Sequence, residues 1–184
     1  MEFDILSKRI NGLLVFDHLD HVCLKAKTEL MGDDFEIHRA AAIKGVNSFL
    51  FDESEKRDFF IEDEKLEGNF VDEQTFAGPF YDIKSKKIKD PINSWGPTTS
   101  LGIAAAALYP NCEFRLPSFL EKKRDEFFTE MLSNILLYDY FIVEWSTNWS
   151  NYFHDGNLYW RSYFWTILFP LNQELLVIGS SVSD

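Results

Sequence analysis

Three runs of aromatic and β-branched residues in the last 45 positions restrict the fold more than any other feature of this chain. The runs span residues 140–145, 158–169 and 175–178. Such side chains suit the pleated surface of a strand. Asp155 and Gly156 separate the first two runs, and glycine adopts the positive φ that a tight turn requires. The pattern therefore predicts a three-stranded antiparallel meander at the C-terminus.

Three earlier segments carry helix signals. Residues 33–50 begin with an aspartate that can cap a helix and contain consecutive alanines, which favour helix. Residues 95–110 contain hydroxyl residues that can cap a helix, followed by small residues, which indicates that this second helix packs closely inside the protein. The third helix begins at Pro117, with Ser118 and Glu121 as its capping pair. Its apolar stripe is expected to consist of Leu120, Phe127, Met131, Ile135 and Tyr138.

The fold class follows from these elements. The first 31 residues are compatible with either a short buried strand or the end of a helix. A chain of 184 residues is long enough to bury a core without disulfides or a structural metal, and its length favours one domain over residues 1–184. We expect an α+β fold, in which helices from the N-terminal two-thirds pack on an antiparallel sheet that includes the C-terminal meander.

Negative charge is concentrated in one segment of the chain. The 30 Asp and Glu residues outnumber 18 Lys and Arg, and residues 52–73 alone contain ten acidic and three basic residues. Apolar residues alternate with these carboxylates, so we expect the segment to be held on a fixed surface that attracts a basic partner and disfavours direct nucleic-acid binding. The carboxylates expected to contact that partner are Asp58, Glu62, Asp63, Glu64, Glu67, Asp72 and Glu73.

Aromatic residues are densest between positions 138 and 169, where thirteen occur in 32 residues. One interpretation is a central strand that is buried on both faces. The other is an exposed Trp and Tyr patch for a protein partner, because these residues dominate interface hot spots. On the second interpretation Trp149 and Tyr152, near the expected turn, are the aromatic anchors.

The residues that could support catalysis or metal binding are few. His18, Asp20, His21 and Cys23 are close in sequence, but no second ligand pair completes a zinc pattern, so we expect neither a metal nor a cofactor. The chain also lacks the usual hydrolase, dinucleotide and P-loop motifs, and we assign no catalytic residue. The alternative is a small hydrolytic or transfer enzyme with Glu144 and His154 as its acid/base pair.

Two features of the sequence predict the cellular compartment: the absence of a targeting signal and the use of cysteine. Met1 is followed by Glu2, Phe3 and Asp4, which differs from the basic and apolar start of a secretory signal. The chain has no uninterrupted apolar run of membrane-spanning length, and its two cysteines, Cys23 and Cys112, lack the spacing of a disulfide framework. We therefore expect a cytoplasmic protein with reduced thiols and no membrane contact.

A small, acidic, cysteine-poor α+β protein without a catalytic motif resembles the immunity proteins of bacterial toxin systems, including contact-dependent growth inhibition. The resemblance covers the composition and the closing aromatic segment, residues 145–184. It implies a protein that binds one cognate toxin, often a basic nuclease, and blocks its active site. An acidic DNA-mimic inhibitor is a further alternative, although the four lysines within residues 84–89 interrupt a phosphate-like array of carboxylates.

Overall fold

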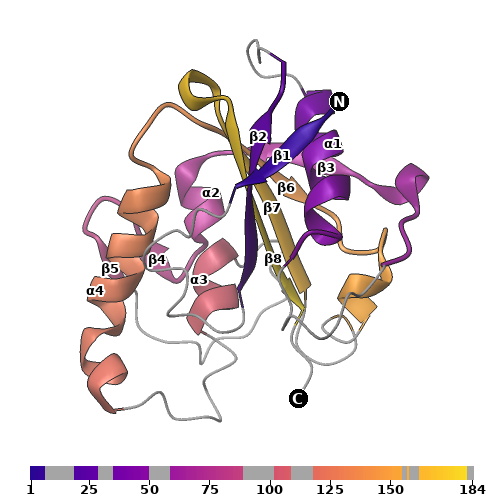
Figure 1. The fold of residues 1–184 in the computed structure, drawn as a ribbon. Helices are drawn as coiled ribbons and strands as arrows, with labels where there is room; N and C mark the ends of the chain where they lie inside the picture. The colour runs from indigo at the N-terminus through magenta and orange to yellow at the C-terminus, as the bar shows by residue number, and fades with distance from the viewer. Residues whose placement is uncertain are drawn as a thin grey trace.

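A six-stranded antiparallel sheet lies at the centre of the molecule (Figure 1). The computed structural model describes residues 1–6, 19–28, 35–49, 59–88, 102–108, 118–154, 157 and 162–181. The strands of the sheet, in spatial order, are β1 (Phe3–Leu6), β2 (Asp20–Ala26), β8 (Glu174–Ser181), β7 (Ser162–Phe169), β6 (Phe141–Trp145) and β3 (Gly68–Val71). The predicted combination of helices with an antiparallel sheet is thus confirmed.

The C-terminal meander is present as strands β6, β7 and β8. Strands β7 and β8 pair over their full length, from Ser162 opposite Ser181 to Phe169 opposite Glu174. Nearly every side chain of these two strands is buried, which confirms the interpretation of a central strand covered on both faces. The predicted tight turn at Asp155 and Gly156 lies outside the described residues; strand β6 ends at Trp145 and β7 begins at Ser162.

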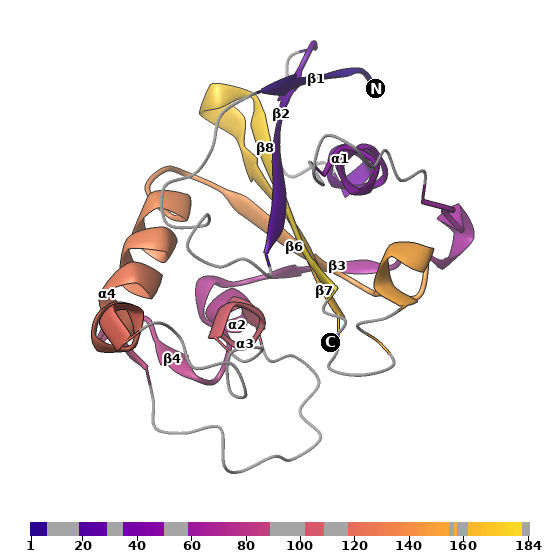
Figure 2. The same ribbon diagram turned by 60° about the horizontal axis from the view of Figure 1, so that its bottom comes forward.

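Helices cover both faces of the sheet and create two separate cores (Figure 2). Helix α1 (Phe35–Val46) packs on β7, β8 and β2 on one face. Helices α2 (Glu73–Ala77), α3 (Gly102–Leu108) and α4 (Ser118–Ile135) lie on the other face, together with the small hairpin β4 (Tyr81–Asp82) and β5 (Lys87–Ile88). Alternate side chains of each central strand therefore enter different cores. We call these two sides the α1 face and the α4 face.

The helices agree in part with the sequence pattern. Helix α1 lies inside the predicted segment 33–50, and α3 is internal as expected, because the described side chains along it are fully buried. The first 31 residues contribute strands β1 and β2, and residues 7–18 lie outside the described part.

The predicted stripe of α4 needs correction. Met131 and Ile135 are buried, but their buried companions are Phe128 and Leu132, which point toward the α4-face core. Tyr138 lies beyond the last residue of the helix and is 52% exposed, because α4 ends at Ile135. The side chains of Leu120 and Phe127 lie outside the described residues.

Candidate interaction surface

The described part of the acidic segment is fixed against the sheet along β3. The backbone N–H of Glu62 donates to the carbonyl of Trp149 at 2.7 Å, and that of Ser146 donates to the carbonyl of Glu67 at 2.7 Å. Leu66, between them, is buried in the α1-face core. The expectation of ordered carboxylates is therefore confirmed from Glu62 onward, whereas Asp58 lies outside the described residues.

The carboxylates ahead of β3 differ in how far their charge is already compensated. Glu62 forms an ion pair with Lys65 across the short turn η2 (Asp63–Lys65), and Asp63 pairs with Arg39 of α1 at 2.8 Å. Glu64 and Glu67 are exposed, and neither forms an ion pair with another described residue. Glu64 and Glu67 thus present the strongest uncompensated charge at this end of the strand.

The carboxylates after β3 are oriented by hydrogen bonds. Asp72 caps helix α2, because its side chain accepts a hydrogen bond from the Thr75 N–H at 2.7 Å. Hydrogen bonding to the Thr75 side chain, and then to the Thr75 N–H, lowers the pKa of Asp72, so the carboxylate stays ionised to a more acidic pH than usual. Glu73 is exposed and accepts a hydrogen bond from the Tyr140 hydroxyl.

Strand β3 connects these two groups at the border of the sheet. It is the last strand in the sheet order, and within the described residues it pairs only with β6. The ring of Phe70 is 46% exposed on this strand. We call Glu64, Glu67, Phe70, Asp72 and Glu73 the β3 strip. The strip combines fixed carboxylates with an aromatic ring, which is a composition suited to a basic protein partner.

The two predicted aromatic anchors are core residues instead of surface contacts. Trp149 is fully buried, with its ring edge-to-face against Phe153 and Phe164 at centroid distances of 5.1 and 5.3 Å. Tyr152 is 7% exposed, and its hydroxyl donates to Asp20 at 2.6 Å. Burial, together with the nearby Asp20 charge, raises the pKa of Tyr152 well above its ordinary value. The segment between β6 and β7 turns these rings inward, so the prediction that they anchor a partner is wrong.

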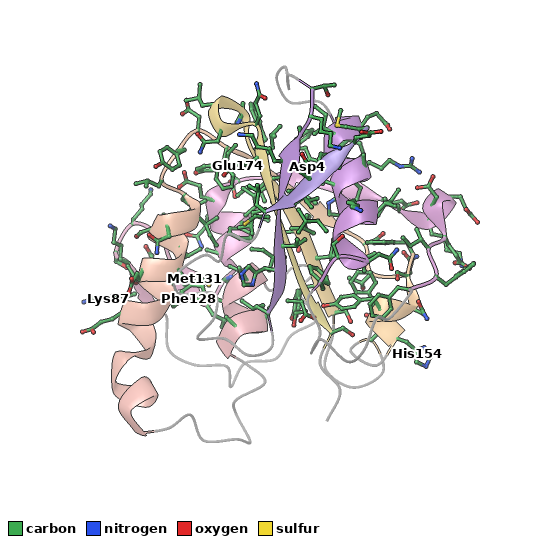
Figure 3. All side chains as sticks on the ribbon, viewed as in Figure 1. Asp4, Lys87, Phe128, Met131, His154 and Glu174 are labelled. Carbon is green, nitrogen blue, oxygen red and sulfur yellow. The ribbon has the colours of Figure 1, made fainter. Side chains whose placement is uncertain are left out.

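The alternative acid/base pair is not brought together. Glu144 lies on β6 in alternation with Val143 and Trp145, so its side chain belongs to the α4 face. His154 is exposed and directly follows η4 (Asn151–Phe153), whose aromatic rings pack in the α1-face core (Figure 3). The sheet thus separates the two side chains, and the geometry gives no support to a shared acid/base site.

The lysine cluster and the acidic turn lie at opposite sides of the molecule. Lys84, Lys86 and Lys87 are exposed on the β4–β5 hairpin beside α4, and Figures 1 and 3 show this hairpin far from η2. Lys89 lies outside the described residues. The lysines therefore form a positive pole that is separate from η2.

No metal site is found in the described part of the chain, where no three His, Cys, Asp or Glu side chains converge. His18 and Cys112 lie outside that part, and Cys23 is buried on the α4 face. No helix among the described residues is long and apolar enough to cross a membrane.

A buried polar cluster beneath the β3 strip was missed by the sequence analysis. The indole N–H of Trp145 donates to the Thr166 hydroxyl at 2.9 Å, and that hydroxyl also contacts His38 Nδ1 at 2.8 Å. All three side chains are buried, and the His38 ring meets Phe70 edge-on at 5.6 Å. The sequence feature that could have revealed this cluster is the position of His38 on the buried face of α1. The other residues of that face are Ile37, Ala41, Ala42, Gly45 and Val46.

Replacing Thr166 with valine is expected to lower the free energy of unfolding by about 1–3 kcal/mol, because a buried indole N–H loses its acceptor. Chemical denaturation measures this loss, and the NMR shift of the Trp145 indole proton reports on the hydrogen bond itself. The matched control is Thr166→Ser, which keeps the hydroxyl and should retain that proton shift. A valine variant as stable as the parent would show that the cluster contributes nothing to stability.

Comparisons of the chain with protein-family models, curated proteins and solved structures found no match.

Proposed function

We propose that this protein is a bacterial immunity protein that binds a basic cognate toxin through the β3 strip and blocks the toxin's active site. The observation that carries the proposal is the placement of ordered, exposed carboxylates at both ends of a border strand, with Glu64 and Glu67 unpaired within the described residues. The charge makes a basic protein, such as a nuclease domain, the partner of choice.

The rigidity of the strip supports this role. Carboxylates on a flexible tail lose backbone conformational entropy when they bind, whereas the backbone that carries Glu64 and Glu67 is already fixed by the hydrogen bonds of Glu62 and Glu67. Fixed negative charge also accelerates the encounter with a positively charged partner. Rapid capture is what a cell needs when a lethal enzyme arrives in its cytoplasm, which is where we propose that the protein acts.

The proposal is tested by capture followed by co-expression. The tagged full chain serves as bait in extracts of the bacterium that encodes it, at low and at high salt, and each captured protein is then expressed with and without the chain. We expect one basic protein that is captured mainly at low salt, binds in a 1:1 complex, and kills cells only when expressed alone. If none of the captured proteins is toxic, or if the chain does not relieve toxicity, the proposed function is wrong.

A further inference from the structure

A surface hollow of about 770 Å³ lies where α4 ends and the β7–β8 connection turns. Residues 136–141 form one wall, and Glu73, Pro170 and Leu171 complete the lining. Pro170 and Leu171 belong to the short turn η5 (Pro170–Asn172), which Figure 1 shows at the same end of the molecule as the final turn of α4. Glu73 belongs also to the β3 strip, so the hollow adjoins the strip.

Exposed apolar side chains gather around this hollow. Leu137, Tyr138 and Leu171 are 64%, 52% and 79% exposed. They account for three of the seven large apolar side chains that are exposed in the described part of the chain. Scattered exposed apolar residues are ordinary, whereas a contiguous group at a concave site indicates a binding surface.

The hollow is presented on a rigid frame. The Gln173 N–H closes the η5 turn on the Pro170 carbonyl at 3.1 Å, and Lys25 Nζ donates to the Asn172 carbonyl at 2.7 Å. On the opposite wall, the Leu136 N–H continues the helical bonding of α4 by donating to Leu132 at 2.8 Å. A preformed site of this kind loses little entropy when it is filled.

The electrostatic character of the hollow is negative. Glu73 and Asp139 are carboxylates of the lining, and none of the lining residues, all of which lie in the described part, is Lys or Arg. The C-terminal end of α4 adjoins the hollow and carries no basic residue in its last turn, so the partial negative charge of its terminal carbonyls is not offset there. Apolar walls with a negative rim fit an apolar side chain that is flanked by cations.

We propose that the hollow binds a segment of the toxin in which one large apolar side chain is flanked by Lys or Arg. The apolar side chain enters between Leu137, Tyr138 and Leu171, while its basic neighbours reach Glu73 and Asp139. The inference rests on the proposed function for the identity of the partner, and it assigns to that partner a specific recognition element. The β3 strip then provides attraction at a distance, and the hollow provides a short-range apolar contact.

The direct test uses a short synthetic peptide with a central Trp flanked by lysines as the probe. Titration of the isotope-labelled full chain, followed by NMR, should shift the resonances of residues 137–139 and 171. Two control peptides, one with Ala for Trp and one with Glu for the lysines, should bind at least about tenfold more weakly. Shifts that map elsewhere, or equal affinity for all three peptides, would overturn the proposal.

A second test compares two variants of the protein, each at an exposed apolar side chain. Leu171→Asp should weaken binding of the Trp peptide by at least about tenfold, because it places a charge on the apolar wall. Phe60→Asp, at a side chain that is 66% exposed and does not line the hollow, should leave binding unchanged. Both sites are exposed, so both variants are expected to fold, and circular dichroism verifies this. If the free protein dimerises and Leu171→Asp abolishes the dimer, the hollow binds a second copy of this chain. That result would overturn the proposal that it binds a toxin segment.

The two proposals fail in different ways. If a toxin is captured and Leu171→Asp binds it as tightly as the parent does, the hollow is not used and only the present inference is wrong. If no toxin is found but the Trp peptide binds at the hollow with the expected discrimination, the immunity role is wrong while the recognition chemistry of the hollow stands.

Discussion

Replacing Glu64 and Glu67 with lysine is expected to slow association with the captured toxin by about 10- to 100-fold at low ionic strength. Both side chains are exposed on fixed backbone beside β3, and neither is offset by an ion pair with a described residue. Their reversal removes attraction and adds repulsion at one place. The effect should shrink as salt is raised, because screening shortens the reach of the charges. Stopped-flow or surface-binding kinetics over a salt series measures it.

The control for this experiment is a second double reversal, Glu126→Lys with Glu130→Lys, on exposed positions of α4. Each pair of substitutions changes the net charge by the same four units, two for each substitution. Only the pair on the β3 strip should greatly reduce the association rate. Equal slowing by the two pairs would mean that total charge attracts the partner and that the strip has no special role. The unfolding temperatures of both variants should stay close to that of the parent.

Truncating Trp149 to alanine is expected to lower the free energy of unfolding by about 3–5 kcal/mol, the usual cost of removing a large buried aromatic ring. The ring is fully buried against Phe153 and Phe164, and its indole N–H donates to the Ser146 carbonyl at 2.6 Å. Chemical denaturation measures the loss. The Trp149 carbonyl that accepts the Glu62 N–H belongs to the backbone and is retained in the alanine variant, so we expect this variant to lose binding only in proportion to its unfolded fraction.

The exposed ring of Phe60 provides the comparison. Phe60→Ala removes a side chain that is 66% exposed and should change the free energy of unfolding by no more than about 0.5 kcal/mol. A folded Trp149→Ala protein with parental stability and lost toxin binding would contradict the buried position of this ring. Trp149→Phe keeps an aromatic side chain but loses the N–H, so its stability should fall between that of the parent and that of the alanine variant.

Local sequence patterns predicted those helices and strands whose formation depends on residues close together in the sequence. The aromatic and β-branched composition identified the strands of the meander, and the small residues of α3 identified an internal helix. The position of Trp149 could not be derived in this way, because buried cores and interface hot spots select the same residue type. The direction in which residues 146–153 turn decides between them, and in the folded protein Trp149 packs against Phe164 of β7.

Sequence patterns could not predict the order of the strands in the sheet, because that order also depends on contacts between distant segments. Strand β3 consists of only Gly68–Val71 inside a strongly acidic segment, and its pairing with β6 leaves no local signature. The same holds for the hollow, since its walls come from three distant parts of the chain. The charge of the acidic segment was visible in the sequence, but the ion pairs of Asp63 and Glu62, which divide it into neutralised and free carboxylates, were not.

Because β8 lies in the middle of the sheet, the sheet can be completed only near the end of synthesis. Strand β8 lies between β2 and β7, so the pairing of residues 20–25 with β8 forms only when residues 174–179 have been made. Contacts of such long sequence separation form late, because a long loop must close before they contribute. A ribosome that stops before residue 174 therefore produces a chain lacking the middle of its sheet. Under the proposed function, protection of the cell depends on completed chains, and shortened chains provide no partial activity.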